Sequence, residues 1–325
     1  MIIRDFDFSR DDPECLWSLY ESVYSGSKAF RDRWSWEVCS YPRGDVRILI
    51  ADCEGEYAGM TMRTAVPLRV QGERVRAWFA TNSLVLPRYR GKGVIGKLYN
   101  NAAETGDLQL SKGTAPVMYR LLLKMGYREI VPNTYLTCVV APLSWALWRL
   151  TGNVPFQNRK HRMDGRYGDF TEVTGIDREA FDGFDDSYYA TLSQDSNYFS
   201  WRYVEAPSRN YRIYIRKQED RTVSRCVLRL EGRTATLVDL RWNAEAGDEP
   251  RRTIRFIKDE ARSQGAVKVV AWANLAPLRR ILNREGFRTR RETPHFSFFS
   301  RDPRWISFPW EQAHFVHGDG DAEYL

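Results

Sequence analysis

A group of glycines and basic residues around position 90 has the composition of a phosphate-binding site. The apolar run Leu84-Val85-Leu86 ends at a proline, which predicts the end of a buried strand. Arg90-Gly91-Lys92-Gly93 follows, and apolar side chains then recur at helical spacing over residues 95–103. Glycines let the backbone approach an anion closely, and the N–H groups and dipole of a helix N-terminus attract negative charge. The stretch therefore predicts a strand, a phosphate-binding turn and a helix.

Two common classes of phosphate-binding segment lack a required feature here. Gly91, Gly96 and Lys97 satisfy the G-x-x-x-x-G-K part of a P-loop, but Leu98 stands where Ser or Thr must hold magnesium. Gly91, Gly93 and Gly96 supply the G-x-G-x-x-G of a dinucleotide fingerprint. No strand ending in an acidic residue follows the helix, however, and such a residue is needed to hold a ribose.

A third class fits better. The run V-L-P-R-Y-R-G-K-G-V-I-G-K-L resembles the pyrophosphate-binding segment of the GCN5-related N-acetyltransferase (GNAT) superfamily, whose pattern is R/Q-x-x-G-x-G/A. Arg90, Gly91, Lys92 and Gly93 match this pattern, while Ile95 replaces the last small residue. Further on, Leu122-Leu123-Lys124-Met125-Gly126-Tyr127 resembles the second signature of the family, a helix that ends in Lys-x-Gly-aromatic.

The resemblance implies a mixed sheet whose fourth and fifth strands separate at one end and hold the pantetheine arm of coenzyme A. In this sequence these are the strand that ends at Leu86 and the strand at 108–110. The expected co-substrate is acetyl-CoA or another acyl-CoA, and no metal is expected. The residues expected to bind it are Leu84, Val85, Leu86, Arg90, Gly91, Lys92, Gly93, Val94, Ile95 and Gly96.

Direct transfer of an acyl group to an amine, which the resemblance also implies, needs a base or a water for the ammonium proton and an acid for the thiolate. Counted from the second signature, the tyrosine acid of the family falls on Leu122. Tyr119 lies about one helical turn earlier and is predicted as the substitute acid. Thr81, Asn82 and Ser83 offer only neutral polar groups where some relatives carry a glutamate base, and Asn82 is the catalytic candidate among them.

The sequence also contains two copies of one pattern. Trp36 and a proline six residues later lead into an Arg-Ile pair, and the same pattern starts 165 positions further on, at Trp201. Residues 115–127 match residues 275–287 at an offset of 160. Two matches in the same order at nearly equal offsets predict a tandem duplication. The expected fold class is α/β with two tandem GNAT-like domains, each a mixed twisted sheet flanked by helices.

The predicted domain organisation follows from this duplication. It comprises a CoA-binding domain at 1–140, a linker with an aromatic helix at 141–168, and a degenerate GNAT-like domain with a C-terminal tail at 169–325. In the second copy, residues 243–250 carry three carboxylates and one glycine where the first copy has its basic turn. Carboxylates at a helix N-terminus repel a phosphate, so the donor is expected to bind only the first copy. The two tryptophans of the linker helix are expected to pack on a neighbouring domain; contact with a membrane or an acyl chain is the alternative.

Composition limits the possible functions. The chain has 325 residues and a formal charge of +7, from 49 basic and 42 acidic side chains that are spread evenly. This distribution argues against a nucleic-acid surface. Five separate cysteines form no metal or disulfide pattern, and neither a signal peptide nor a membrane span is apparent. A cytoplasmic location without integral membrane association is expected.

The sequence thus predicts an acyl-CoA-dependent N-acyltransferase that transfers acetyl from acetyl-CoA to an amine of a small molecule or amino sugar. Two alternatives remain open. One is a long-chain N-acyltransferase that uses acyl-CoA or acyl carrier protein on an amino acid or peptide. The other is a non-catalytic CoA-binding module. The aromatic tail, with Trp305, Phe308 and Trp310 before a Gly-Asp-x-Asp run, loosely resembles the end of tandem acetyltransferase-like proteins, and a frayed end is equally compatible with its sequence.

Overall fold

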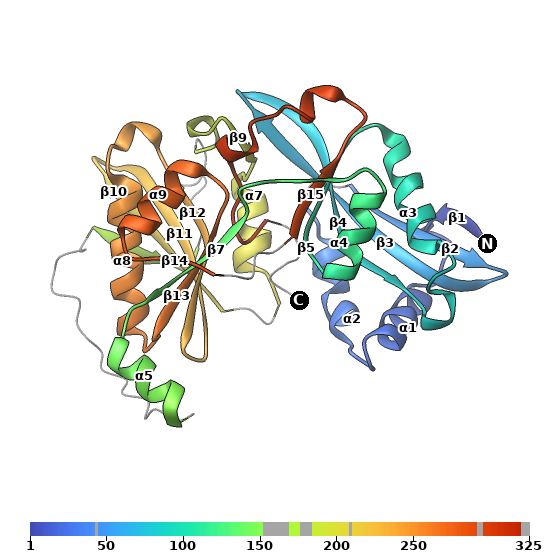
Figure 1. Ribbon diagram of the computed structural model, residues 1–325, viewed down its shortest axis with the longest axis horizontal. Coiled ribbons are helices and arrows are strands. Elements are labelled where there is room, and N and C mark those ends of the chain that lie inside the picture. The colour runs from blue at the N-terminus through green and yellow to red at the C-terminus, as the bar shows by residue number, and fades with distance from the viewer. Residues whose placement is uncertain (43–44, 152–168, 176–183, 208–209, 291–294, 320–325) are drawn as a thin grey trace.

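Two lobes, each a mixed sheet with helices on its faces, make up the molecule (Figure 1). The computed structural model describes residues 1–42, 45–151, 169–175, 184–207, 210–290 and 295–319. Residues 152–168 of the predicted linker and the last residues of the tail therefore lie outside the described part of the chain. The predicted fold class, two mixed α/β sheets flanked by helices, is confirmed.

The first sheet carries the predicted CoA-binding segment. Its main strand order is β1-β2-β3-β4-β5-β15-β6, and within this order only β4 and β5 pair in parallel. Its strands are β1 (Ile2–Asp5), β2 (Val46–Cys53), β3 (Glu56–Val70), β4 (Glu73–Val85), β5 (Leu108–Thr114), β6 (Arg128–Glu129), β9 (Ala190–Leu192), β15 (His295–Phe299) and β16 (Ala313–His314). Its helices are α1 (Pro13–Val23), α2 (Ala29–Trp34), α3 (Val94–Ala102) and α4 (Pro116–Lys124).

The second sheet has the order β14-β7-β13-β12-β11-β10-β8. Its strands are β7 (Thr134–Val139), β8 (Phe170–Val173), β10 (Tyr211–Gln218), β11 (Arg221–Glu231), β12 (Thr234–Trp242), β13 (Lys268–Ala273) and β14 (Arg288–Thr289). The helices of this half are α5 (Pro142–Thr151), α7 (Ser196–Phe199), α8 (Glu249–Ser263) and α9 (Ala276–Arg284). One parallel pair, β12 with β13, lies beside antiparallel hairpins, as β4 with β5 does in the first sheet.

The two sheets exchange strands. β7 precedes the predicted boundary at residue 140, yet it pairs with β13 of the second sheet. β15 comes from the C-terminal half and pairs with β5 and β6 of the first sheet. In Figure 1 the green β7 crosses into the orange lobe, while the red β15 lies in the blue lobe. Each sheet is thus completed by a strand from the other half of the chain.

The repeated tryptophans pair with each other. Trp36 and Trp201 are the second residues of two equivalent π-helical turns, Ser35–Cys39 and Ser200–Val204. Their rings stack with centroids 4.5 Å apart and an angle of 11° between the planes. The indole N–H of Trp36 donates to the carbonyl of Trp201 at 2.7 Å, and that of Trp201 donates to the carbonyl of Trp36 at 2.8 Å. This reciprocal pairing places the two copies about a local pseudo-two-fold axis.

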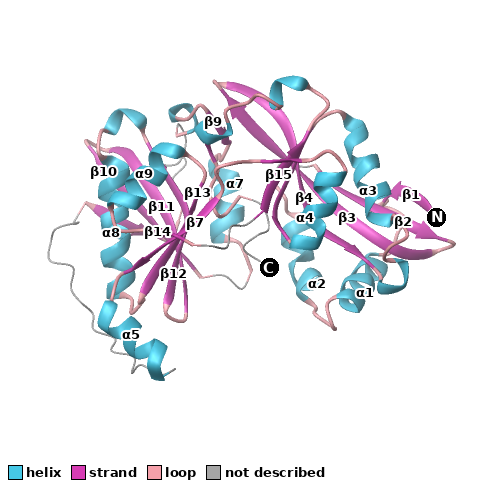
Figure 2. Cartoon of the chain, in the orientation of Figure 1, coloured by secondary structure: helices cyan, strands magenta, loops and turns pink. Residues whose placement is uncertain are grey.

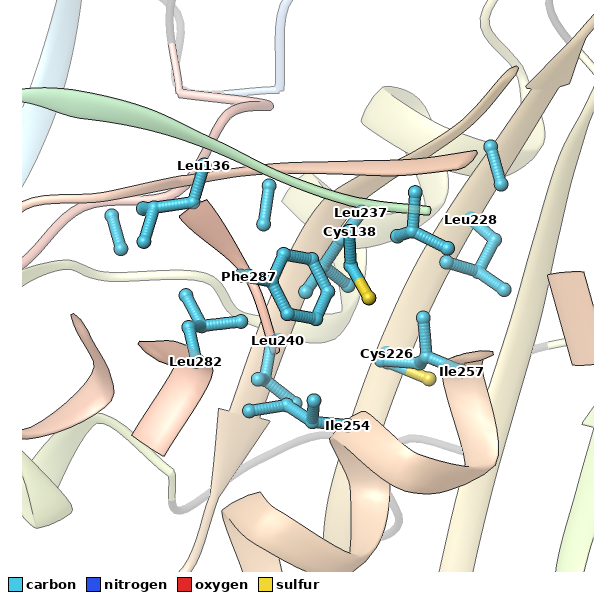
Figure 3. Close-up of a cluster of buried hydrophobic side chains, with 14 of the residues drawn as sticks. Leu136, Cys138, Cys226, Leu228, Leu237, Leu240, Ile254, Ile257, Leu282 and Phe287 are labelled. Atoms are coloured by element: carbon cyan, nitrogen blue, oxygen red, sulfur yellow. The ribbon is translucent and has the colours of Figure 1, made fainter. Parts of the chain in front are cut away.

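Apolar side chains of the exchanged strand β7 enter the core of the second lobe. Leu136 and Cys138 face Leu237, Leu282 and Phe287, which come from β12, α9 and the segment after α9 (Figure 3). Cys138 is 5% exposed, and burial raises the pKa of its thiol, so this cysteine acts as a buried apolar residue. The exchange therefore fixes the relative position of the lobes through buried hydrophobic area.

Helix α5 lies at the far end of the second lobe (Figure 1). Leu143 and Leu150 on this helix are 89% and 84% exposed. Trp148 is half-buried, and the ammonium of Lys268 lies 5.7 Å from its ring centroid. Among the described residues, no helix combines the length and the apolar character needed to cross a bilayer.

Candidate functional site

The predicted phosphate-binding turn leads directly into α3. Gly91 and Gly93 have φ values of 76° and 75°, in the left-handed region, and Gly93 is the N-cap of the helix. No other group lies within 4 Å of the position that a Cβ would take at either glycine, so the backbone here faces open space. The helix is held on the sheet by Val94 and Leu98, which are buried against β2. A backbone of this shape, open in front of a helix N-terminus, can accept an anion.

Charged side chains surround this turn. Arg88 forms an ion pair with Glu56, and the hydroxyl of Tyr89 donates to the same carboxylate at 2.7 Å. Glu56 thereby anchors the start of the turn on the β2–β3 hairpin. The ammonium of Lys92 lies 5.2 Å from the ring centroid of Tyr89. Lys92 and Lys97 are exposed on the same side of the chain as the glycines and can add positive charge to an anion site.

The strands β4 and β5 separate beyond the end of their short parallel ladder. Only three residues of β4 pair with β5, and the last pair is Phe79 with Leu110. β4 continues to Val85 without a partner on that side among the described strands. The predicted CoA residues Leu84, Val85 and Leu86 line this separated edge, and the carbonyl of Val85 accepts from Nε of Arg90 at 3.3 Å. A gap therefore runs from the glycine turn down to Phe79.

A bulge interrupts β4 inside this gap. The pairing of β3 with β4 shifts register between Met60 and Met62, opposite Asn82, which has φ 43°. The side-chain amide of Asn82 donates to Glu37 at 2.9 Å. Glu37 comes from the π-helical turn Ser35–Cys39, is 7% exposed, and also pairs with Nε of Arg33 at 3.2 Å. The structure thus brings a buried carboxylate to the predicted residue Asn82, where the strand itself carries only neutral groups.

Glu37 lines a small cavity of about 40 Å³ between the lobes. Trp36, Trp201 and Arg202 contribute to its wall, so both copies of the repeat form it. The remaining lining residues are Tyr41, Thr64, Val66, Phe79, Thr81 and Tyr198. Aromatic rings and a carboxylate are suited to an amine, because the rings attract cations and the carboxylate accepts protons.

Tyr119 of α4, the predicted acid, contacts β15. Its ring stacks on His295 of β15 with centroids 3.8 Å apart. Burial, with the nearby carboxylate of Glu129, raises the pKa of Tyr119 to about 12. The gap side of α4 is formed instead by Met118 and Leu122, which pack with Tyr99.

A chain of hydroxyl groups lies nearer the bulge. The hydroxyls of Thr61 and Ser83 are 2.7 Å apart, and those of Ser83 and Tyr99 are 2.9 Å apart. Neither Tyr99 nor Glu37 was identified as a site residue from the sequence. The repeated tryptophan, Trp36 in the first copy and Trp201 in the second, was the available signal near Glu37, although Arg202 stands at the equivalent position of the second copy. Tyr99 carries no such signal, because a tyrosine on the apolar face of a helix resembles any core residue.

The equivalent gap of the second sheet is occupied by the C-terminal tail. β12 and β13 pair up to Leu237 and Ala271. Beyond that point the backbone N–H of Gly318 donates to the carbonyl of Val238 at 2.9 Å, and Nε2 of His314 donates to that of Leu240 at 2.7 Å. Residues 313–319 are all buried. The described part of the tail is therefore an ordered element of the fold rather than a frayed end.

The helix after this second gap already holds a carboxylate at its N-terminus. Glu249 is the first residue of α8 and is 3% exposed. Its two oxygens pair with Arg216 at 2.5 Å and with the hydroxyl of Ser224 at 2.6 Å. This side chain occupies the electropositive end of α8, where a phosphate would otherwise bind. Within the described residues, no group of three or more His, Cys, Asp or Glu side chains is placed to hold a metal ion.

Comparisons with known proteins agree with this geometry. The sequence model of the acetyltransferase (GNAT) domain matches residues 9–129, which contain the glycine turn, the gap and Glu37. The comparison with curated protein sequences gives no match.

Solved structures share the two-lobed fold. A GCN5-related N-acetyltransferase from Kribbella flavida superposes with a TM-score of 0.62 at 14% identity, covering 92% of this chain and 72% of that one. A probable N-acyltransferase from Enterococcus faecalis gives 0.60 at 12%, covering 92% and 72%. The N-myristoyltransferase of Saccharomyces cerevisiae with bound myristoyl-CoA gives 0.57 at 12%, covering 92% and 82%. Residues 9–129 therefore match the sequence model of the acetyltransferase (GNAT) domain, and the whole chain shares its two-sheet fold with solved GCN5-related N-acetyltransferases.

Proposed function

We propose that this protein is an acyl-CoA-dependent N-acyltransferase that transfers an acetyl group to an amine of a small molecule or amino sugar. The observation that carries the proposal is the position of Glu37. This buried carboxylate contacts Asn82 at the bulge of β4, between the gap assigned to the donor and the aromatic cavity. A base at the meeting point of two binding spaces is what direct transfer requires.

In the proposed reaction the pyrophosphate of the donor binds the turn formed by Arg90, Gly91, Lys92 and Gly93, and its pantetheine arm lies along the gap. Glu37 takes the proton of the attacking ammonium, and Asn82 holds the carboxylate in place. Tyr119 is the acid suggested by the sequence, and Tyr99 is a second candidate because its hydroxyl reaches Ser83 at the bulge. The amine nitrogen then forms the amide bond while the carbon–sulfur bond of the thioester breaks.

We further propose that only the first copy binds a donor, within the domain organisation 1–140, 141–168 and 169–325. Two observations support a structural role for the second copy. The tail residues His314 and Gly318 bond to the edge of β12 that a pantetheine arm would need. Glu249 occupies the N-terminus of α8 with negative charge. The second copy therefore supplies a wall of the acceptor cavity, through Trp201 and Arg202, rather than a second donor site.

The cavity is too small, as it stands, for an amino sugar or a long acyl chain. A space of about 40 Å³ holds only a few water molecules, whereas pockets for small-molecule ligands enclose several hundred Å³. Side chains around the cavity must therefore move to admit an acceptor, and a short acyl group requires less movement than a long one. Acetyl-CoA is the proposed donor, and a long-chain donor and a non-catalytic binding role are the alternatives.

Calorimetric titration with CoA tests the donor site. A Cβ is strained at the left-handed conformation of Gly93, so Gly93→Val should abolish binding. Gly106→Val is the matched control, because Gly106 has φ 76° and equally open surroundings but lies outside the turn. Glu245→Ala, in the second copy, should bind CoA normally. Normal binding by Gly93→Val together with lost binding by Glu245→Ala would refute the assignment.

Thiol release from a series of acyl-CoA donors, with amino sugars, amino acids and peptides as acceptors, tests the reaction. Turnover with acetyl-CoA is expected. Turnover with long-chain donors alone would show that the transferred group is a fatty acyl group rather than acetyl. CoA binding without turnover would indicate a non-catalytic binding module. Submicromolar affinity for DNA or RNA that falls steeply with salt would contradict a small-molecule acceptor.

A further inference from the structure

A buried arginine lies beneath the gap assigned to the donor. Arg63 of β3 is 1% exposed, and none of its three guanidinium nitrogens has a hydrogen-bond partner among the residues that the structure describes. Its guanidinium carbon lies 4.1 Å from the ring centroid of Tyr99. Burial of an unpaired cation is costly, and one aromatic face recovers only part of that cost. Arg63 therefore weakens the fold unless its charge has another use.

The surroundings of Arg63 are short of acceptors. The hydroxyl of Tyr127 belongs to the same cluster as Tyr99 and lies near Arg63, although the two do not meet hydrogen-bond geometry. Burial raises the pKa of Tyr127 to about 12, while the positive charge of Arg63 acts in the opposite direction. Tyr127 thus stays protonated. The cluster contains a cation and a phenol, and no carboxylate from the described part of the chain bonds to Arg63.

The strand register places Arg63 at the closed end of the gap. Arg63 pairs with Ala80, which directly follows Phe79, the last residue of β4 paired with β5. Tyr99 connects this point to the bulge, because its ring covers Arg63 while its hydroxyl reaches Ser83. A donor that enters at the glycine turn and follows β4 ends here with its thioester. This placement rests on the proposed function.

We propose that Arg63 is a fixed buried cation that stabilises the thiolate of coenzyme A as it leaves the thioester. In this step Glu37 takes one proton of the ammonium, and the amine nitrogen that results bonds to the thioester carbon. The nitrogen then carries one proton more than an amide has, and this second proton passes to water. The carbon–sulfur bond breaks, and its electron pair remains on sulfur as a thiolate. Arg63 transfers no proton; its charge acts through a medium of low dielectric, where a preorganised charge has its largest effect.

The alternative, protonation of the thiolate by Tyr119, is unfavourable. A phenol with a pKa of about 12 is a much weaker acid than a thiol with an ordinary pKa of about 8.5. Proton transfer from Tyr119 to the thiolate would therefore run uphill. Electrostatic stabilisation by Arg63 lets the sulfur leave without a proton, which also explains why Leu122 and Met118 can form the gap side of α4.

The test compares Arg63→Met with Arg47→Met. Methionine fills much of the arginine volume without charge. Arg47 is the control because it lies beside Arg63 on the paired strand β2 but bonds to Asp5 at 2.5 Å. The pKa of the thiol of bound CoA is measured from the ultraviolet absorbance of its thiolate. In the wild type we expect this pKa to lie about one unit or more below 8.5, a tenfold effect. Arg63→Met should remove that pKa shift and lower kcat about tenfold or more, with KM for the donor unchanged. Arg47→Met should keep the wild-type thiol pKa and the wild-type kcat.

Stability of the unliganded protein distinguishes this role from a structural one. Removing an unpaired buried charge should leave the Tm of Arg63→Met equal to or above that of the wild type. A lowered Tm, or a thiol pKa that is the same in the wild type and Arg63→Met, overturns the proposal for Arg63 alone. A wild-type protein that binds no CoA overturns the proposed function, and the role of Arg63 with it.

Discussion

Acidification should loosen the C-terminal tail from the second sheet. His314 is 1% exposed, stacks on Tyr188 at 4.4 Å and donates to the carbonyl of Leu240. Burial, with the nearby charge of Arg241, lowers the pKa of His314 from 6.5 to about 3. Because the unfolded chain takes up this proton first, the stability that the neutral ring contributes is present above about pH 6.5 and is lost as the pH falls toward 3.

The size of the effect follows from the two pKa values. A pH of 5 is about 1.5 pH units below the pKa of the histidine in the unfolded chain, whereas the ring in the folded protein is still neutral at this pH. At 1.36 kcal/mol per unit, the free energy of unfolding falls by about 2 kcal/mol between pH 7.5 and pH 5. His317, whose pKa is also lowered by burial, adds to this loss. The raised pKa of Asp319 acts in the opposite direction, since a carboxyl that binds its proton more tightly in the folded state gains stability on acidification.

Urea unfolding at pH 7.5 and pH 5 provides the assay. His314→Gln keeps an N–H donor for Leu240 and removes the titrating ring. Between the two pH values, the free energy of unfolding of the wild type should fall by about 2 kcal/mol more than that of this variant. The protection factor of the Gly318 amide against hydrogen exchange should fall in the wild type over the same range, because this amide bonds to β12. An identical pH dependence in the two proteins would refute the reasoning.

Three substitutions test other parts of the molecule. Glu37→Gln still accepts the hydrogen bond of Asn82 but cannot take a proton, so kcat should fall by about 10² to 10⁴ while calorimetry shows unchanged CoA affinity. Tyr119→Phe should retain turnover if the thiolate leaves without a proton. A fall in kcat of about 10² or more with CoA affinity unchanged would instead make Tyr119 the acid and contradict the role of Arg63, and such a fall in Tyr99→Phe alone would assign the acid to Tyr99. Trp201→Ala removes a stacked ring that is 6% exposed and should cost about 3–5 kcal/mol of the free energy of unfolding, measured in urea.

Local patterns in the sequence determined much of this protein. The glycines at 91 and 93 predict a turn that needs left-handed backbone, and both residues adopt it. Apolar spacing predicts α3 and α4, and the offsets of 165 and 160 residues predict two related sheets. These features depend on neighbours in the chain or on recurrence along it, so one sequence suffices to find them.

Other features were decided only by tertiary structure. The exchange of β7 and β15 cannot be read from the duplication, because each strand would fit either sheet by its own pattern. The contact of Glu37 with Asn82 joins residues 45 positions apart. The burial of His314 depends on a gap between β12 and β13 that only the folded second sheet creates. A residue acquires such a role from the groups that surround it, and long-range packing alone brings those groups together.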